Sequence, residues 1–335
     1  MRAWEIGRFG LEKLALVERP DPQPGPGQVV VRVRAASLNY RDLMTIQGTY
    51  NPKQKLPLIP GSDGAGEIVA VGPGVRRVRV GDRVCSVLAQ HWVAGEPTRE
   101  RVRSSLGGPF DGVLAELALL SEDGVVPAPA HLSDEEAATL PCAALTAWNA
   151  LVTEGRVTAG DTVLVQGTGG VSLFALQIAR LIGARVIVTS SSDDKLARAL
   201  ELGAAEGINY RTVPDWGGRA KELTGGRGVD HVIEVGGAGT LQQSLRALRF
   251  GGRISLIGVL AGGTAEIPLA LIFMQKASVQ GIIVGDRDSF EAMNRALELH
   301  QLHPVIDSTF AFDQVPAALE RMASGRHFGK IVIEV

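Results

Sequence analysis

The apolar residues of this chain fall into short runs, and the character of these runs changes near residue 125. In the first part the runs are rich in β-branched residues and lie between proline and glycine turns, as at 29–33, 66–71 and 83–87. Such runs are typical of strands, so this part is expected to be mainly β. Proline occupies every second position over 20–27, and because it lacks an amide donor, this stretch is predicted to be a surface loop.

Beyond residue 125, helical and strand patterns alternate. Ser133 is followed three residues later by Glu136, as in a capping box, and small apolar residues continue to Val152, so a helical segment is expected there. Continuous apolar strands then alternate with amphipathic helices, which is typical of a parallel sheet covered on both faces. The expected strands are 162–166, 185–189, 207–210, 229–235, 253–258 and 278–284, and the expected helices are 170–182, 193–202 and 240–248. Six such strands favour a dinucleotide-binding fold.

The last fifty residues or so carry two further helical patterns, near 290–300 and 314–324, and a closing strand at 330–335. We expect this tail to rejoin the first domain. The predicted organisation is therefore a first domain over 1–125, a dinucleotide-binding domain over 126–286 and a return over 287–335, with a cleft between the two domains.

Composition narrows the function classes. With 335 residues and 45% hydrophobic content the chain is long enough for two cores. Its formal net charge of -2 offers no excess of basic charge, so neither nucleic acid nor an anionic membrane is an expected partner. The N-terminus lacks the apolar run of a signal peptide, and no uncharged stretch approaches the roughly 20 residues that span a bilayer. The expected location is the cytoplasm.

A glycine-rich turn follows the first strand of the alternating region. Gln166 ends that strand, and Gly167, Thr168, Gly169, Gly170 and Val171 lead into a helix, with Ser172 at the third small position. Gly167 would allow the tight turn, and Gly169 would let the backbone approach a pyrophosphate, which the amides at the helix N-terminus would then bind. Strand, turn and helix agree, so a dinucleotide cofactor is predicted.

The end of the second strand bears on the choice between NAD and NADP. An NAD enzyme usually places an acid there to bind the adenosine ribose, but this chain has Ser190. Ser191, Lys195 and either Tyr210 or Arg211 offer donors and positive charge for a 2′-phosphate, so NADP(H) is predicted. The alternative is that Lys195 is a solvated helix residue and that Asp193 or Asp194 reaches the ribose.

Six runs spread over the chain carry a family resemblance: Ser37–Asp42, Pro60–Gly66, Val80–Val84, Thr139–Pro141, the glycine turn and His327–Lys330. Together they resemble the quinone oxidoreductase and zinc-independent alcohol dehydrogenase branch of the medium-chain dehydrogenase/reductase superfamily. The resemblance covers nearly every residue. It implies an α/β protein with a GroES-like, partly open β-barrel domain and a Rossmann doubly wound parallel sheet, hydride transfer in the cleft, and a homodimer.

The residues that would bind zinc are missing. Zinc-dependent relatives place a cysteine near Asn39 and a histidine followed by glutamate near Ser62 and Asp63, and this chain has neither. Cys85 and Cys142 cannot supply the four ligands of a structural zinc site. We therefore expect no zinc, no other metal site and activity that survives chelation.

Without a Lewis acid, the negative charge that develops on a carbonyl oxygen must be stabilised by hydrogen-bond donors. By resemblance Asn39, Asp42 and Tyr50 lie at the nicotinamide and the substrate, as catalytic residues. The alternative for Asn39 and Asp42 is a loop held by side-chain to backbone bonds, and for Asp42 the two roles are equally expected. The alternative for Tyr50 is that its ring covers an apolar surface with its hydroxyl group in water. Trp92 and Phe110 flank an arginine-rich insertion, 95–108, expected either to form a lid or to pack locally. The full set expected at the cofactor is Thr146, Gly167, Thr168, Gly169, Gly170, Val171, Ser190, Ser191, Lys195, Tyr210, Gly258, Gly329 and Lys330.

The predicted function is zinc-independent, NADPH-dependent reduction of a quinone or an α,β-unsaturated carbonyl compound. Hydride reaches the β-carbon, Asn39 or Tyr50 stabilises the resulting enolate, and water reprotonates the carbon. A first alternative is a zinc-free alcohol dehydrogenase or carbonyl reductase acting on an alcohol or ketone. A second is a nucleotide-binding protein without significant turnover, including an RNA-binding role, against which the near-neutral charge argues.

Overall fold

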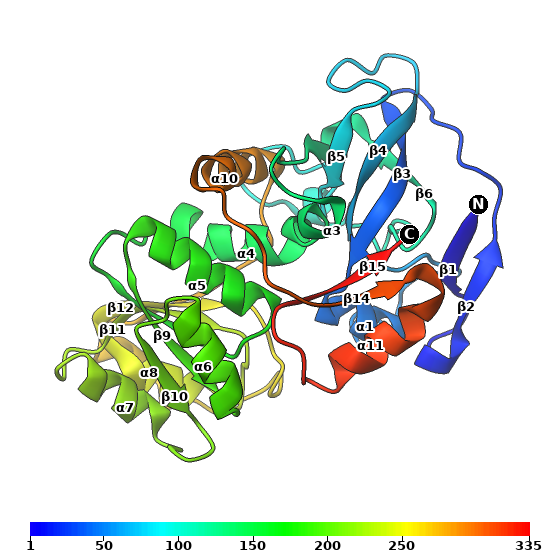
Figure 1. Ribbon diagram of the computed structural model, residues 1–335. Coiled ribbons are helices and arrows are strands. Elements are labelled where there is room, and N and C mark those ends of the chain that lie inside the picture. The colour runs from blue at the N-terminus through cyan, green and yellow to red at the C-terminus, as the bar shows by residue number, and fades with distance from the viewer. The chain divides into compact units, whose positions relative to one another are not determined.

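The computed structural model describes residues 1–335, and these form two compact units (Figure 1). The first unit contains Met1–Leu145 and Gly285–Val335, and the second contains Thr146–Val284. The first boundary lies after Leu145, whereas the sequence pattern placed it at 125/126. The difference arises because α3 (Asp134–Ala137) packs on β3 and β4 of the first unit, so this helical stretch belongs with the β region.

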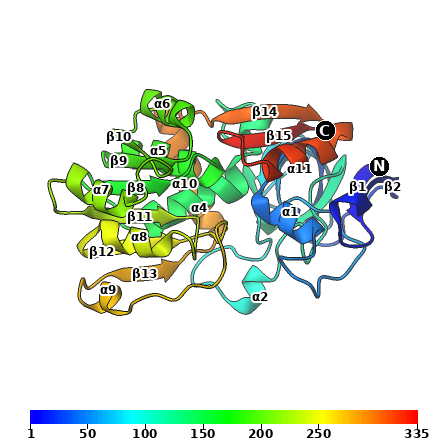
Figure 2. The ribbon, with the colours of Figure 1, turned by 90° about the horizontal axis from the view of Figure 1, so that it is seen from below.

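A six-stranded parallel sheet forms the centre of the second unit. Its strand order is β10-β9-β8-β11-β12-β13, which Figure 2 shows edge to edge. The strands are β8 (Thr162–Gln166), β9 (Arg185–Ser190), β10 (Glu206–Asn209), β11 (Val229–Glu234), β12 (Leu248–Leu256) and β13 (Ser278–Gly281). The chain leaves β8 toward one edge and later returns beside β8 as β11, so the order reverses between these two strands. The predicted doubly wound parallel sheet is confirmed.

The helices of the second unit are α4 (Leu145–Trp148, which begins at the boundary), α5 (Gly170–Ile182), α6 (Asp193–Glu201), α7 (Trp216–Leu223), α8 (Leu241–Ala247) and α9 (Ala270–Phe273), with the π-helix η4 (Asn149–Thr153). α5 has the predicted bounds, because Gly169 caps its start and Gly183, at φ 92°, ends it in the left-handed conformation. α7 was not predicted: its second and third residues are glycines, which weaken the helical pattern, and the Asp215 side chain caps it.

The first unit is built on a seven-stranded sheet. Six strands follow the order β14-β15-β3-β4-β5-β7, and β6 pairs with β3 on a separate branch. The strands are β3 (Gln28–Ser37), β4 (Asp63–Val71), β5 (Arg83–Ser86), β6 (Leu117–Ser121), β7 (Val125–Pro127), β14 (Ile306–Ala311) and β15 (Lys330–Glu334), and β1 (Arg2–Ile6) pairs separately with β2 (Leu14–Glu18). The mainly β first domain is confirmed, and 20–25 is free of helix and strand as predicted. β14 was missed because Asp307 and Ser308 interrupt its apolar pattern.

The helices of the first unit are α1 (Tyr40–Ile46), α2 (Arg99–Val102), α3, α10 (Arg287–His300) and α11 (Val315–Ala323), with the 3-10 turns η1 (Leu11–Lys13), η2 (Glu122–Gly124) and η5 (Phe312–Gln314) and the π-helix η3 (Leu140–Ala144). The helix expected from Ser133 to Val152 is therefore interrupted. Pro141 lies in the first turn of η3, where it removes one amide donor from the ladder. Each unit buries its own apolar core, and none of the helices is long and apolar enough to cross a membrane.

Candidate active site

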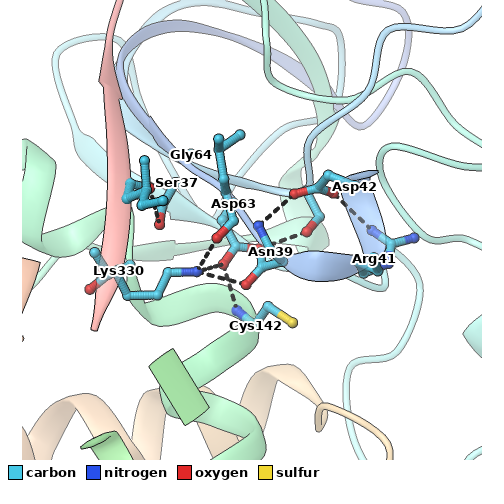
Figure 3. Close-up of polar contacts among 12 residues, drawn as sticks. Ser37, Asn39, Arg41, Asp42, Asp63, Gly64, Cys142 and Lys330 are labelled. Carbon is cyan, nitrogen blue, oxygen red and sulfur yellow. Dashed lines mark hydrogen bonds and ion pairs between the residues drawn. The ribbon is translucent and has the colours of Figure 1, made fainter. Parts of the chain in front are cut away.

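A buried polar cluster in the first unit forms where three strands pair. In the antiparallel register of β15 and β3, Val332 lies opposite Ser37, so the chain before Val332 runs alongside the residues that follow Ser37. Ser37 also lies opposite Asp63, the first residue of β4. The two pairings bring together Asn39, Asp63 and Lys330, which are far apart in the sequence (Figure 3).

Lys330 supplies the cation of this cluster. Its side chain is almost completely buried, and Nζ donates to the backbone oxygen of Leu38 at 2.7 Å and to Oδ1 of Asn39 at 2.6 Å. Oδ2 of Asp63 lies 4.0 Å from the same nitrogen. The structure places the ammonium group of Lys330 inside the first unit against Asn39, and the expected contact of Lys330 with the cofactor stays a prediction.

Asp63 is completely buried and lies beside a thiol. Its Oδ1 accepts a hydrogen bond from the Ser62 hydroxyl at 2.7 Å, and its Oδ2 accepts one from the backbone N–H of Cys142 at 3.0 Å. Burial raises the pKa of Asp63, while the charge of Lys330 and hydrogen bonds from Asn39 and Ser62 oppose the rise. Burial, helped by the charge of Asp63, raises the pKa of the Cys142 thiol to about 12. This thiol therefore stays protonated at neutral pH.

Asp42 lies in the first turn of α1 and is also completely buried. Its Oδ2 accepts a hydrogen bond from the backbone N–H of Asn39 at 2.8 Å, which gives this carboxylate the side-chain to backbone bond that the sequence left open. Its Oδ1 has no hydrogen-bond partner and lies 3.8 Å from Nη1 of Arg41. Burial raises the pKa of Asp42 to about 6, against the opposing charge of Arg41.

Arg41, which was not predicted as a site residue, connects α1 to the insertion. Its guanidinium group lies 5.2 Å from the centre of the Tyr50 ring, and Nη1 donates to the backbone oxygen of Leu106 at 3.0 Å. Tyr50 is 54% exposed, so its ring covers Arg41 while its other face meets solvent. Arg41 thus holds the loop after α1 beside the end of the insertion.

The residues flanking the insertion differ in their surroundings. Trp92 is buried and donates to the backbone oxygen of Gly95 at 2.8 Å, while its own backbone oxygen accepts from Arg287 at the start of α10. Trp92 therefore packs locally. Phe110 is exposed and meets His91 edge to face at 5.7 Å.

The glycine turn of the second unit has the geometry expected of a nucleotide-binding turn. Gly167 adopts φ 71°, and its amide donates to the backbone oxygen of Thr189 at 2.7 Å. A Cβ atom added at Gly167 or at Gly169 would meet no atom within 4 Å, so the backbone faces open space at both positions. The Ser172 hydroxyl donates to the Gln166 backbone oxygen at 2.7 Å, which ties the start of α5 to the end of β8.

Ser190 ends β9 and is buried, with its hydroxyl accepting from the backbone N–H of Ser192 at 3.3 Å. Tyr210 follows the neighbouring strand β10, and its backbone N–H donates to the backbone oxygen of Ser190 at 3.0 Å. The carboxyl ends of β9 and β10 are therefore adjacent. Asp193 accepts a hydrogen bond from the side chain of Asn209 at 2.8 Å. Asp193, the first acidic residue after β9, therefore already accepts a hydrogen bond from Asn209.

The other residues expected at the cofactor have varied surroundings. Thr146 and Thr168 are buried, while Val171, Ser191 and Lys195 are half-buried. A Cβ atom at Gly258 would lie 2.6 Å from the Val235 backbone oxygen, and one at Gly329 would lie 2.2 Å from that of Val305. At both positions a larger residue would clash with the backbone, so close packing alone accounts for the glycine.

A buried carboxylate at the end of β11 was missed. Glu234 is the last residue of β11, the strand beside β8, and its oxygens accept five hydrogen bonds, from Gln166, Gly236, Gly237, Thr240 and Ser244. The carboxyl ends of β8 and β11 meet where the strand order reverses, so an acid at this point followed by two glycines was the available signal. The network fixes the two turns that follow β8 and β11.

Two family models match the chain. The alcohol dehydrogenase GroES-like domain matches residues 25–130, and the zinc-binding dehydrogenase model matches residues 170–299. Nowhere in the chain do three or more His, Cys, Asp or Glu side chains group in a way that could hold a metal ion. The donors around Asn39 do not fit zinc, because the ammonium group of Lys330 already binds the Asn39 oxygen and lies near Asp63.

Similar proteins span nearly the full chain. A zinc-type alcohol dehydrogenase-like protein of Schizosaccharomyces pombe is 45% identical over 97% of this chain and 96% of its own length. The quinone oxidoreductase of Homo sapiens is 31% identical (97% and 94%), and the acryloyl-coenzyme A reductase of Metallosphaera sedula is 30% identical (94% and 95%).

Solved structures confirm the fold. A putative alcohol dehydrogenase from Sinorhizobium meliloti 1021 superposes with a TM-score of 0.94 at 46% identity, covering 100% of this chain and 98% of that one. A mycobacterial protein solved in complex with NADPH superposes with a TM-score of 0.86 at 27% identity, covering both chains completely, and it supports a nicotinamide cofactor here. This chain therefore belongs to the medium-chain dehydrogenase/reductase superfamily and is an oxidoreductase of that superfamily.

Proposed function

We propose that this oxidoreductase uses NADPH, without zinc, to reduce a quinone or the carbon–carbon double bond of an α,β-unsaturated carbonyl compound. The observation that carries the proposal is the amide of Asn39, whose Nδ2 is buried near the Asp63 carboxylate but forms no hydrogen bond of normal geometry, beside a lysine cation. Such a donor suits an oxygen that gains negative charge. The names of two relatives, a quinone oxidoreductase and an acryloyl-coenzyme A reductase, support the same two substrate classes.

The glycine turn supports the cofactor. The open space over Gly167 and Gly169 lets a pyrophosphate approach the backbone, and the N-terminus of the 13-residue helix α5 follows immediately. When bound, NADPH supplies the hydride. The residues proposed to hold it are Thr146, Gly167, Thr168, Gly169, Gly170, Val171, Ser190, Ser191, Lys195, Tyr210, Gly258 and Gly329.

The choice of NADPH over NADH rests on the end of β9. Ser190 stands where an acid would bind the ribose of NADH, and Asp193 is engaged by Asn209. A 2′-phosphate would therefore meet hydroxyl groups and the neighbouring Lys195 in place of a carboxylate. The NADPH complex of the mycobacterial relative supports this choice.

The chemistry proposed for the chain's own side chains is stabilisation of an enolate. Hydride adds to the β-carbon, the electron pair of the double bond moves toward the carbonyl, and the oxygen becomes negative. Nδ2 of Asn39 donates a hydrogen bond to this oxygen, and the Tyr50 hydroxyl is the second candidate donor. A proton from water then adds to the α-carbon and gives the saturated carbonyl compound.

Product analysis tests this proposal. The purified protein is incubated with cyclohex-2-enone and NADPH carrying deuterium at C4, with and without EDTA, and the product is identified by mass spectrometry and NMR. We expect cyclohexanone with deuterium on the β-carbon in both arms. Loss of turnover in EDTA together with one bound zinc per chain would refute the zinc-independent mechanism. If neither cyclohex-2-enone nor a quinone consumes NADPH, the proposal of quinone or enone reduction fails.

A second candidate function is interconversion of a ketone and an alcohol. The relative from Schizosaccharomyces pombe and the structure from Sinorhizobium meliloti, which are 45% and 46% identical to this chain, are both named for alcohol dehydrogenase. Formation of the allylic alcohol in the same experiment would favour this function. A nucleotide-binding role without turnover has no such support among these names.

We also propose a homodimer formed through the edge strand β13. One side of β13 pairs with β12, and its other side is free for a further strand. Large apolar residues are exposed on and near this edge: Val259, Leu260, Leu269, Phe273, Met274, Val279 and Ile283. A second copy of the chain would cover this apolar surface and would supply hydrogen-bond partners for the backbone groups on the free side of β13.

A further inference from the structure

The buried lysine of the Asn39 cluster determines which way the Asn39 amide points. An ammonium group has three donors and no acceptor, so only Oδ1 of Asn39 can face Lys330, at 2.6 Å. Nδ2, which carries both amide hydrogens, must then occupy the opposite end of the side chain. Lys330 therefore fixes Oδ1 as the acceptor end of the side chain and Nδ2 as its donor end.

The donor left by this orientation is incompletely satisfied. Nδ2 is buried and forms no hydrogen bond of normal geometry, although the Asn39 side chain is near enough to Asp63 to help lower the pKa of that carboxyl group. A buried amide without a full partner costs free energy in the resting protein. A carbonyl oxygen that became negative at this donor would recover that free energy.

The charge of Lys330 also offsets the negative charge of the carboxylates around Asn39. Two carboxylates, Asp42 and Asp63, and two cations, Arg41 and Lys330, surround Asn39, and all four are buried or nearly buried. The four formal charges balance when both carboxylates are ionised. Without Lys330 the cluster would carry a negative charge, which would repel an oxyanion forming beside it.

We propose that Lys330 is a positioning residue for reduction: it holds Oδ1 of Asn39, so that Nδ2 faces the substrate oxygen, and its charge polarises the amide and strengthens Nδ2–H as a donor. This inference rests on the proposed function. Hydrogen bonds in series strengthen one another, so a cationic donor on Oδ1 increases the acidity of the hydrogens on Nδ2. Lys330 transfers no proton in this scheme and does not touch the substrate.

The kinetic test combines Lys330→Met with Asn39→Ala. We expect Lys330→Met to lower kcat for cyclohex-2-enone by about 30-fold, less than the roughly 100- to 1,000-fold loss found when an oxyanion donor is removed outright, and to change KM and NADPH affinity less than threefold. Because Lys330 acts through Asn39, Lys330→Met should lower kcat less than threefold further in the Asn39→Ala background. The loss should also grow along a series of enones whose enolates are increasingly basic, whereas a general loss of packing would affect all of them equally.

Two controls separate positioning from folding. Lys13→Met removes an exposed lysine of the same unit and should leave kcat unchanged. Lys330→Arg keeps the charge and the donors and should retain more activity than Lys330→Met. The inference is overturned if Lys330→Met keeps kcat within threefold of wild type, or if it lowers kcat equally in the wild-type and Asn39→Ala backgrounds.

A spectroscopic measurement tests the inference without turnover. The side-chain NH2 signals of Asn39 are assigned in a ¹H–¹⁵N spectrum from their absence in Asn39→Ala. We expect them to move in Lys330→Met more than any other Asn or Gln side-chain pair, and not to move in Lys13→Met. Unchanged Asn39 signals would overturn the role of Lys330 whatever the substrate is. Moved signals in a protein that reduces neither enone nor quinone would refute the proposed function while leaving the orientation of Asn39 intact.

Discussion

Replacement of Asp42 by asparagine should change the free energy of unfolding of the first unit in a pH-dependent way. The value for the variant minus that for the wild type should be higher at neutral pH than in acid. Asp42 is completely buried, and burial raises its pKa from 3.8 to about 6 despite the nearby charge of Arg41. The folded state therefore holds this proton more tightly than the unfolded state. The stabilisation from the protonated form is fully present below pH 3.8, is lost as the pH rises through about 6, and stays lost above it.

The size of the effect follows from the two pKa values. The rise from 3.8 to about 6 corresponds to about 3 kcal/mol at 1.36 kcal/mol per pH unit, of which about 2 kcal/mol falls between pH 4 and pH 7. Asparagine is uncharged at every pH and can still accept the hydrogen bond from the Asn39 backbone. The free energy of unfolding of Asp42→Asn minus that of the wild type should therefore rise by about 2 kcal/mol over this range.

Urea unfolding followed by tryptophan fluorescence measures this difference. Trp148 and Trp216 lie in the second unit, and their replacement by phenylalanine leaves Trp4 and Trp92, which report on the first unit alone. The matched control is Asp313→Asn, which removes an exposed carboxylate of the same unit and should give a flat difference. A difference for Asp42→Asn that is independent of pH, or that falls between pH 4 and pH 7, would show that burial does not dominate the pKa of Asp42.

Three further predictions concern the donors, the cofactor and the assembly. Asn39→Ala should lower kcat for an enone by about 100-fold and Tyr50→Phe by about tenfold, and unchanged turnover in both would remove them from the mechanism. Ser190→Asp should weaken NADPH binding at least tenfold while leaving NADH binding within threefold, measured by fluorescence titration, because a carboxylate repels the 2′-phosphate. Phe273→Glu with Val279→Lys should convert a dimer into a monomer in light scattering, and an unchanged mass would place the interface elsewhere.

The fold of the second unit could be predicted from local patterns. β8 and α5 were predicted with their observed bounds, because the strand, the glycine turn and the amphipathic helix each have a distinct signature. α7 was missed since its glycines hide a helix that the Asp215 cap and packing against α8 hold in place. Its stability depends on a neighbour that local propensity does not describe.

The elements of the first unit were predicted less completely. The helix α1 was not expected at Tyr40–Ile46, because Tyr40, Arg41 and Asp42 break the apolar spacing of its seven residues. Asp42 instead supports the helix through its hydrogen bond to the Asn39 backbone. Asn39 and Asp42 were named as candidates from the family resemblance, and this bond shows that a structural role for Asp42 coexists with any functional one.

The position of Lys330 could not be derived from the sequence, for a reason that also bears on its function. Its neighbours, Asn39 and Asp63, meet it only because β15 pairs with β3 and β3 with β4 in one particular register. A shift of one residue would turn each side chain to the other face of the sheet, and no local pattern specifies the pairing of strands so far apart in the chain. A lysine is almost never buried without partners, so the register that buries it must also supply the oxygens that bind it. The same contacts that make this burial possible, to Leu38 and to Oδ1 of Asn39, turn the amide nitrogen of Asn39 away from Lys330, and this nitrogen is the donor that we propose for a substrate oxygen.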